Sequence, residues 1–244
     1  EDLPDIIPDY VTVLFSEKGS CVQRNCGIDH CQDESDAIVF IDDDTFLHPT
    51  FICELERLFA ENPEFAALKG ILIKDGGITV DEAMELLESH TPEKAEVLKS
   101  ASLYGGYAIR TSMLDGLRYD ERLVLYGWLE DADLAANLRK KGSIGCSRSL
   151  VGVHLMFSSG GRSNHVRFGF SQIMNPFYLS KKNRDVFSFQ SVFRDHWFKA
   201  VGANVRGMII ERDRKMRWDR FKGNVIAFGM LLSGRVEPEY AGKL

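Results

Sequence analysis

Long apolar runs, an even number of cysteines and internal repeats are all missing from this chain of 244 residues. Its longest apolar run, 225–232, is far shorter than the roughly 20 residues that cross a bilayer. Five cysteines, an odd number, exclude a complete disulfide framework and favour a reducing compartment. The acidic stretch 1–10 lacks the apolar core of a signal peptide. We therefore expect a cytoplasmic protein, and a 44% hydrophobic composition suits one large domain with an appendage.

Acidic and basic residues are unevenly distributed along the chain. Residues 1–160 carry 14 Lys and Arg against 29 Asp and Glu, whereas residues 161–244 carry 16 against 7. The basic C-terminal third could meet anionic lipid, a polyanionic ligand or the acidic body itself. Its basic segment 212–222 and apolar segment 225–232 favour peripheral contact with the cytoplasmic face of a membrane.

Strand and helix patterns alternate over the first 155 residues, which predicts an α/β fold with a mixed, mainly parallel sheet flanked by helices. The stretch 37–41, "AIVFI", is apolar on both faces and is therefore predicted to be a central strand. From about residue 170 onward the chain is basic, aromatic and predominantly helical in pattern. The other expected strands are 10–15, 66–73, 103–110 and 149–157, and the expected helices of the first part are 21–31, 51–59, 80–100 with a break near Pro92, and 128–142.

Three consecutive aspartates at positions 42–44 directly follow the strand pattern 37–41. In open α/β sheets, ligands bind beyond the carboxyl ends of the strands. Two carboxylates about 4 Å apart repel each other by roughly 4 kcal/mol at an effective dielectric constant near 20, so a compensating cation is expected. Carboxylate oxygens suit Mg²⁺ or Mn²⁺, which also bind phosphate oxygens. The alternative is a solvated acidic turn that caps the following helix.

The segment "GSCVQRNCGID", followed by "DAIVFIDDDT", resembles the nucleotide-sugar half of glycosyltransferase family 2, inverting enzymes of GT-A fold. That family holds a divalent ion and the donor with an Asp-x-Asp sequence. The resemblance implies that Asp44 is a metal ligand and that Asp42 faces the ribose or sugar of the donor, with a metal contact also possible. It further implies that Asp43, Arg24 and Asn25 lie near the donor.

A second acidic group stands at the start of the predicted helix 128–142, where Glu130 precedes Asp131. On helical spacing Asp131 shares a face with apolar residues, whereas Glu130 and Asp133 lie elsewhere. From the residues alone, these acids either serve as a general base or simply satisfy the helix N-terminus. The resemblance implies that Asp131 is the catalytic base. The acceptor would then lie against Glu130 and the aromatic residues Trp128 and Tyr126, which could equally belong to the core.

His154 lies in the predicted strand 149–157, and a lone strand histidine is commonly a hydrogen-bonded core residue. Many members of the family place a metal-binding histidine on the strand after the Glu-Asp helix, which implies a metal site of Asp44, His154 and diphosphate oxygens. The following loop contains Gly160 and Gly161 and carries Arg162, which could close over the diphosphate of the donor. An ordinary surface loop is the alternative.

The resemblance covers roughly residues 10–185 and implies transfer of a sugar from a UDP-, dTDP- or GDP-linked donor to a glycan or a lipid-linked acceptor, with Mn²⁺ or Mg²⁺ as cofactor. No nucleic-acid partner is expected. The predicted organisation is a catalytic region, 1–168, and a helical basic region, 169–244. The strand–turn–helix unit with which family members normally begin, and which holds the nucleotide base, has no counterpart before "VTVLF". Three alternatives follow: the chain is a fragment, its base site is built differently, or its donor binding is impaired.

Two other functions compete with this interpretation. The run "IVFIDDDTFL" also resembles the haloacid-dehalogenase phosphatases, in which Asp42 would be a nucleophile and Asp131 or Asp133 would hold Mg²⁺. Against this, Thr45 stands one place early for that pattern. The second competitor is a non-catalytic protein that binds sugar nucleotides.

Overall fold

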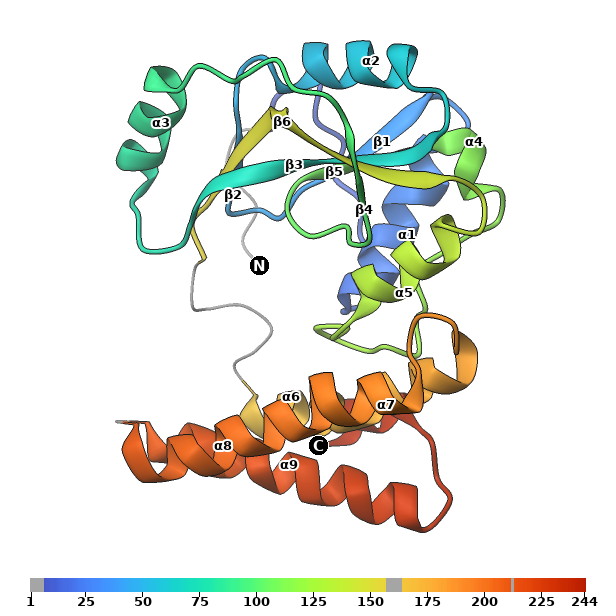
Figure 1. Cartoon of the computed structure of the whole chain (residues 1–244), viewed down its shortest axis with the longest axis vertical. Helices are drawn as coiled ribbons and strands as arrows, with labels where there is room; N and C mark the ends of the chain where they lie inside the picture. The colour runs from blue at the N-terminus through green and yellow to red at the C-terminus, as the bar shows by residue number, and fades with distance from the viewer. Residues whose placement is uncertain (1–6, 157–163, 212) are drawn as a thin grey trace.

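The computed structural model describes residues 7–156, 164–211 and 213–244. A six-stranded sheet forms one part of the molecule, and a layer of long helices lies below it in Figure 1. On one face of the sheet, buried residues of α2 (Phe51–Glu61) pack against the strands. On the other face, α1 (Ser20–Cys31) and α5 (Glu130–Leu138) contribute to the largest core cluster. The expected α/β class with flanking helices is confirmed.

The sheet is mixed. Its strands are β1 (Ala37–Phe40), β2 (Thr45–Leu47), β3 (Phe65–Asp75), β4 (Leu98–Ser100), β5 (Tyr107–Arg110) and β6 (Ser143–His154). The order is β1-β5-β3-β6-β2, with β4 also beside β6. The long pairing of β3 with β6 is parallel, whereas the other four pairings are antiparallel. The expectation of a mainly parallel sheet is thus corrected, because short strands add to both sides of one long parallel pair.

Two strand predictions are wrong. Residues 11–17 form no strand, although their side chains alternate as in a strand, because no neighbouring segment pairs with them. Tyr10 and Phe15 are accordingly 90% and 82% exposed. The strand β1 stands at the edge of the sheet rather than at its centre. Its residues Ala37, Ile38 and Val39 are accordingly only half-buried. An apolar run shows that both faces of a strand can be covered, but it does not show what lies beside the strand.

The remaining helices of the sheet part follow their sequence signals. α3 (Val80–Ser89) begins with a capping box in which Thr79 and Glu82 satisfy each other's backbone N–H groups, and it ends before the break expected near Pro92. The helix expected to continue to residue 100 does not form, and residues 98–100 pair with β6 as β4 instead. α2 buries Phe51, Leu55, Leu58 and Phe59, whereas Ile52 is 48% exposed. A short helix, α4 (Thr111–Leu114), follows β5.

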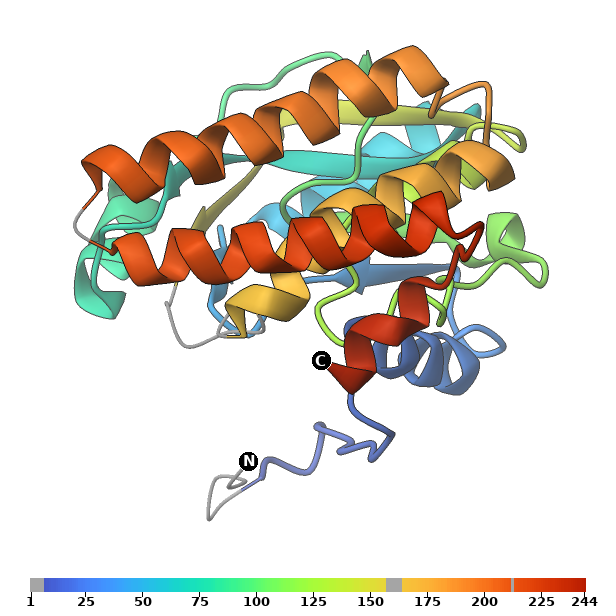
Figure 2. The ribbon, with the colours of Figure 1, turned by 90° about the horizontal axis from the view of Figure 1, so that it is seen from below.

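The C-terminal layer is helical, as predicted. It comprises α6 (His165–Lys182), α7 (Phe189–Ser191), the π-helix Val192–Trp197, α8 (Phe198–Ile210), α9 (Arg214–Leu232) and the 3₁₀ helix Pro238–Lys243. Figure 2 shows α6, α8 and α9 side by side in this layer. Because α6 begins at His165, the predicted boundary between residues 168 and 169 falls inside a helix. The division into two regions stays a prediction.

Two glycines allow α6 and α9 to approach closely. A Cβ atom at Gly169 of α6 would overlap the backbone of Arg220, and one at Gly223 of α9 would overlap the carbonyl oxygen of Val166. The backbones of the two helices are therefore in direct contact at this crossing, which any larger residue would force apart. Among the helices in the described part of the chain, none is both long and apolar enough to cross a bilayer.

All five cysteines are free. Cys21 is buried at the start of α1, Cys53 is exposed on α2, and the other three are partly buried.

Candidate active site

The strand register places His154 between two carboxylates. His154 is the last residue of β6 and is opposite Asp75 at the end of β3. On the other side of β6, Thr45 of β2 is opposite His154, and Asp44 immediately precedes Thr45. Three strands of the sheet therefore bring Asp44, His154 and Asp75 together at one end, as the sequence implied for the first two.

Hydrogen bonds orient the imidazole ring of His154. Its Nδ1 lies 2.8 Å from Asp75 Oδ1, and its Nε2 lies 3.1 Å from Asp44 Oδ1. The Tyr104 hydroxyl donates a hydrogen bond to the other oxygen of Asp75 at 2.8 Å. An Nδ1–H donated to Asp75 leaves the Nε2 lone pair directed at the side of the ring where Asp44 lies. The side chains of His154 and Asp44 are 17% and 13% exposed, so the pair is mostly shielded from water.

The spacing of Asp44 and His154 suits a shared metal ion. Two neighbouring ligands of an octahedral ion at 2.0–2.1 Å stand about 3 Å apart, and the observed separation of Oδ1 and Nε2 is 3.1 Å. One carboxylate oxygen and one imidazole nitrogen form a donor set that Mn²⁺ accepts readily and Mg²⁺ less so. Within the described residues, no group of three or more His, Cys, Asp or Glu side chains forms a metal site. The other ligands would have to come from a bound diphosphate or from water.

Arg24 of α1 connects the two acidic groups that the sequence singled out. Its guanidinium nitrogens lie 3.1 Å from Asp42 Oδ1 and 2.7 Å from Glu130 Oε1, so that residues 88 positions apart converge on one cation. Asp42 is thus paired with Arg24, and its expected contacts with the donor and the metal stay predictions. Asp43 is exposed beside it.

Glu130 is the most perturbed acid of the site. Its side chain is only 14% exposed. Burial, followed by the nearby charge of Asp131, raises the pKa of Glu130 to about 7, although Arg24 opposes the shift. Glu130, which was expected against the acceptor, forms an ion pair with Arg24. Its contact with an acceptor stays a prediction. Asp131 is half-buried, and its Oδ1 accepts a hydrogen bond from the backbone N–H of Ala132.

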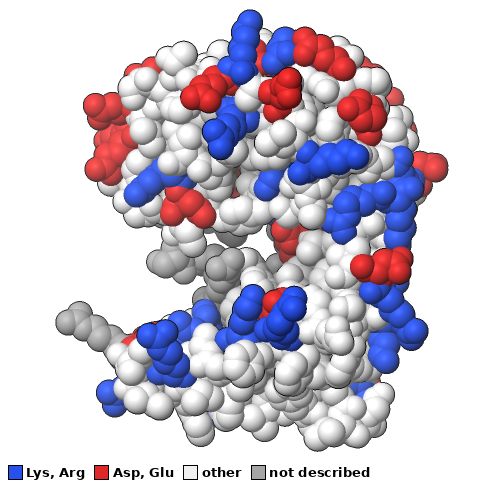
Figure 3. All heavy atoms as spheres, viewed as in Figure 1, with Lys and Arg blue, Asp and Glu red and all other residues white. Residues whose placement is uncertain are grey.

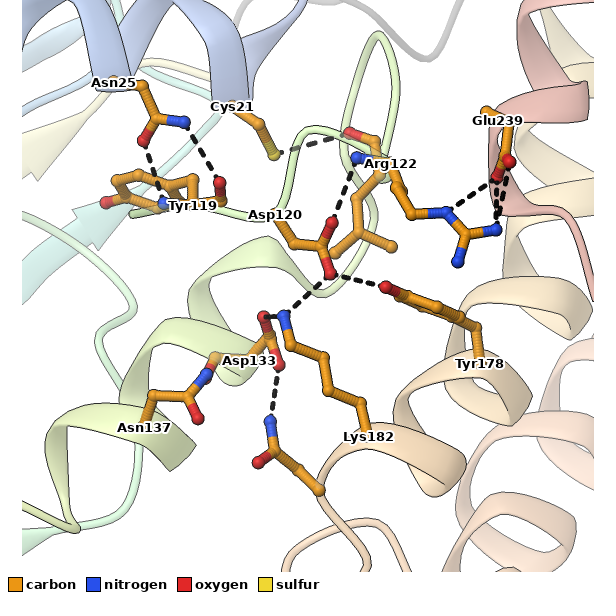
Figure 4. A network of polar contacts seen from close by, with 12 residues as sticks. Cys21, Asn25, Tyr119, Asp120, Arg122, Asp133, Asn137, Tyr178, Lys182 and Glu239 are labelled. Carbon is orange, nitrogen blue, oxygen red and sulfur yellow. Dashed lines mark hydrogen bonds and ion pairs between the residues drawn. The ribbon is translucent and has the colours of Figure 1, made fainter. Parts of the chain in front are cut away.

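Asn25 of α1 bonds to the segment that leads into the loop before α5. It is buried, its amide donates to the carbonyl oxygen of Tyr119 and to Glu121, and its Oδ1 accepts from the Tyr119 N–H. These protein partners use the amide of Asn25, and its expected place near the donor stays a prediction. Together with Cys21, whose thiol donates to the Leu123 carbonyl, Asn25 fastens the loop before α5 to α1 (Figure 4).

Backbone strain marks the loop before α5. Leu125, Gly127 and Leu129 have φ angles of 60°, 64° and 75°, in the left-handed region that leucine rarely adopts. Ser20 at the N-terminus of α1 holds this loop, because its N–H donates to the Leu125 carbonyl at 2.8 Å. Strained backbone of this kind is concentrated at functional sites, where the surrounding contacts enforce it. Here it positions the first turn of α5, which carries Glu130 and Asp131.

The aromatic residues Tyr126 and Trp128 pack together beside α6. Their ring centroids are 6.4 Å apart, and both rings meet Phe168 of α6 edge-on. The amide of Asn175 on α6 donates a hydrogen bond to the Trp128 carbonyl. The two rings therefore connect the loop to the helical layer while remaining partly exposed, and their contact with an acceptor stays a prediction.

Asp133 is the buried acid of α5, contrary to the helical phase inferred from the sequence. It is 1% exposed and pairs with Lys182 at 2.6 Å and with the amide of Asn183 at 2.6 Å (Figure 4). A carboxylate enclosed by these partners is not available to a metal ion. The phosphatase alternative thus loses Asp133 as a Mg²⁺ ligand, and its proposed nucleophile Asp42 is paired with Arg24.

Figure 3 shows a hollow between the sheet part and the helical layer, and Figure 1 places the end of β6 and the loop before α5 on the side facing that layer. Arg162 lies outside the described residues. Sequence reasoning missed Asp75 and Tyr104, and it also missed the buried pair Tyr107 and Tyr119, whose hydroxyls are hydrogen-bonded beneath Arg24. The signal for Asp75 was present, since a carboxylate directly follows the strand pattern "ILIK".

Residues 1–115 match the family model described as Glycosyl transferase family 2. This match confirms the resemblance for the part of the chain that carries Arg24, Asp42, Asp44 and Asp75. No curated protein matches the chain significantly. Among solved structures, the chain is similar to the crystal structure of GalNAc-T7 with UDP, GalNAc and Mn²⁺, at 12% identity and a TM-score of 0.47. That similarity covers 90% of this chain but only 45% of the other, so this chain spans less than half of its length.

Proposed function

We propose that this chain performs metal-dependent glycosyl transfer with inversion, moving a sugar from a nucleoside-diphosphate sugar to a hydroxyl of a glycan or lipid-linked acceptor. The observation that carries the proposal is the convergence on Arg24 of Asp42 and Glu130, which joins the two acidic groups into one site. The family match over residues 1–115 supports the donor half of that site.

Asp44 and His154 are the residues that would hold Mn²⁺ or Mg²⁺, on the spacing of their Oδ1 and Nε2 atoms. When bound, the ion would supply positive charge against the diphosphate of the donor. Asp75 and Tyr104 would keep the imidazole in the ligating orientation, since a carboxylate on the far nitrogen is the usual partner of a metal-binding histidine.

Asp131 is the proposed general base. It would take the proton of the acceptor hydroxyl while the hydroxyl oxygen attacks the anomeric carbon, and the bond from that carbon to the diphosphate oxygen would break with its electron pair leaving on the diphosphate. Its neighbour Glu130 is held by Arg24 and has a pKa of about 7. Arg24 thereby keeps the cluster of carboxylates from accumulating uncompensated negative charge.

The donor and metal are tested by thermal shift and calorimetry with UDP-, dTDP- and GDP-sugars, with and without Mn²⁺. We expect one nucleotide class to bind in a Mn²⁺-dependent way, and Asp44→Asn or His154→Ala to weaken that binding at least tenfold. Asp115→Asn is the matched control, because this aspartate after α4 is 88% exposed and belongs to neither acidic group of the site. Equal weakening by all three substitutions would contradict the assignment of the ligands.

Catalysis is tested separately on the donor identified in this way. Asp131→Asn should keep donor affinity and lower the turnover rate by a factor of roughly 10² to 10⁴, the usual contribution of a general base. The product anomer, read by NMR, should be inverted relative to the donor. A wild-type protein that binds donor and Mn²⁺ but never turns over with any acceptor would favour the non-catalytic alternative.

The role of Asp75 has a readout that does not need turnover. We expect Asp75→Asn to weaken Mn²⁺ binding by about 10- to 100-fold, the range for residues that orient a metal-binding histidine, and Tyr104→Phe to weaken it less. Titration of Mn²⁺ followed by electron paramagnetic resonance measures both. Unchanged affinity in Asp75→Asn would show that this carboxylate does not orient the ligand.

A further inference from the structure

The outer sides of α8 and α9 carry exposed apolar side chains. On α8, Phe198, Val205 and Ile209 are 70%, 39% and 68% exposed, and their spacing of seven and four residues places them on one stripe. The opposite side of α8 contains the buried residues Asn204 and Gly207. The exposed apolar stripe therefore lies on a different side of α8 from the residues that pack into the core.

On α9 the same arrangement recurs. Trp218, Val225 and Leu232 are 49%, 54% and 90% exposed and repeat every seven residues, so they also form one stripe. Both helices contact α6 and each other, and their exposed stripes therefore point away from these contacts. Figure 2 shows the two helices side by side at the surface of the layer. We call these six side chains the outer helical face.

Lysine and arginine border both stripes. Lys199 and Arg206 lie along one side of the α8 stripe, and Arg214, Lys215 and Lys222 lie along or beside the α9 stripe. The side chains of Lys199, Lys215 and Lys222 are 68%, 88% and 50% exposed, and each pairs with a neighbouring carboxylate, Asp195 or Asp219. Residues 189–234 hold nine Lys and Arg against four Asp and Glu, so the layer is positive overall. Figure 3 shows the red spheres mainly over the sheet part.

We propose that the outer helical face docks onto the surface of a lipid bilayer that contains anionic headgroups. Aromatic and aliphatic side chains enter the boundary between headgroups and acyl chains, while the bordering cations meet the anionic headgroups. A second copy of this chain fits the face less well, because two identical faces would bring their positive borders together. This proposal does not depend on the glycosyltransferase assignment, since vesicle binding needs neither donor nor metal.

Vesicle flotation of the full chain tests the proposal. Phosphatidylcholine vesicles with about a third phosphatidylglycerol should bind the protein at least tenfold more tightly than pure phosphatidylcholine, and added salt should weaken the binding. Phe198→Ser combined with Ile209→Ser should lower the affinity at least tenfold. Leu98→Ser is the matched control, because Leu98 on β4 is 66% exposed but lies outside the helical layer.

Tryptophan fluorescence gives an independent readout. Emission should shift to shorter wavelength when anionic vesicles are added, and Trp218→Phe should remove most of that shift while binding persists. Absence of binding to anionic vesicles, or equal loss in Leu98→Ser and in the α8 double variant, would overturn the proposal. Concentration-dependent dimers that the α8 double variant abolishes, without vesicle binding, would overturn it in favour of self-association.

Discussion

At the scale of single residues, charge compensation decides how the site is built. Five acidic side chains gather at one end of the sheet and at the start of α5: Asp42, Asp44, Asp75, Glu130 and Asp131. Arg24 neutralises part of this charge. Protonation offers a second route, because Glu130 has a pKa of about 7. The repulsion that remains costs folding stability, and the divalent cation proposed at Asp44 and His154 would reduce it.

The raised pKa of Glu130 predicts how stability depends on pH. The folded state holds the proton of Glu130 more tightly than the unfolded chain, so this residue's contribution is fully present below pH 4.5 and is lost as the pH rises through about 7. Between those limits the wild type should lose about 3 kcal/mol of unfolding free energy that Glu130→Gln does not lose. Urea unfolding of both proteins at several pH values measures the difference.

Glu88→Gln is the control for this experiment, since Glu88 is exposed on α3. It should follow the wild type at every pH. If Glu130→Gln and the wild type show parallel stability profiles from pH 4.5 to 8, then Glu130 titrates normally and the burial argument is wrong.

At the scale of helices and strands, local sequence patterns predicted which elements form better than they predicted which elements lie side by side. The capping box at Thr79, the apolar face of α2 and the helical C-terminal third all follow from short-range patterns. The edge position of β1 and the absence of a strand at 11–17 depend on which segments pair. The residues of these two segments do not by themselves show which segment would pair with them. A strand pattern shows which side chains of one segment can be buried, whereas pairing depends on a second segment as well.

The same limit applies to the candidate site. The family resemblance correctly brought Asp44 and His154 together, because their positions are tied to strand ends. It did not reveal that Asn25 is buried, that Arg24 connects Asp42 with Glu130, or that Asp133 is the enclosed acid of α5. Those outcomes depend on the side chains of α1 and α6, which approach from distant parts of the sequence.

The crossing of α6 and α9 gives a prediction at this scale. Gly223→Ala should lower the unfolding free energy by about 2–3 kcal/mol, because the added methyl group would force two helix backbones apart. Gly229→Ala, on the same helix, has open space around the new methyl group and should raise stability by up to about 1 kcal/mol. Opposite signs in thermal unfolding are expected. A neutral Gly223→Ala would show that the helices can separate at little cost.

At the scale of the whole molecule, a polar network connects the sheet part to the helical layer. Lys182 of α6 contacts Asp120 at 2.7 Å and Asp133 at 2.6 Å, and Tyr178 donates a hydrogen bond to Asp120 (Figure 4). Although burial opposes the shift, these hydrogen bonds hold the pKa of Asp120 below its usual value. Nearby, Arg122 pairs with Glu239 of the final 3₁₀ helix. The two parts are therefore joined by charge as well as by packing.

Removal of Lys182 should weaken this connection. Lys182→Met leaves the carboxylate of Asp133 buried without its cation, and we expect a loss of about 3 kcal/mol in unfolding free energy. Lys181→Met, one residue earlier on the same helix, removes an exposed lysine over the ring of Phe177 and should cost less than about 1 kcal/mol. Chemical unfolding compares them. A loss that is equal in the two variants would mean that Lys182 contributes only surface charge.

The free cysteines have a practical consequence for spectroscopy. Burial, aided by the charge of Glu130, raises the pKa of Cys21 to about 12, which makes that thiol unreactive towards maleimides at neutral pH. Cys53 is the exposed thiol, and α2, which carries it, lies across the sheet from the helical layer in Figure 1. A dye coupled to Cys53 would therefore sit on the side remote from α8 and α9. Energy transfer from that dye to labelled lipids would report the height of the sheet above a bilayer.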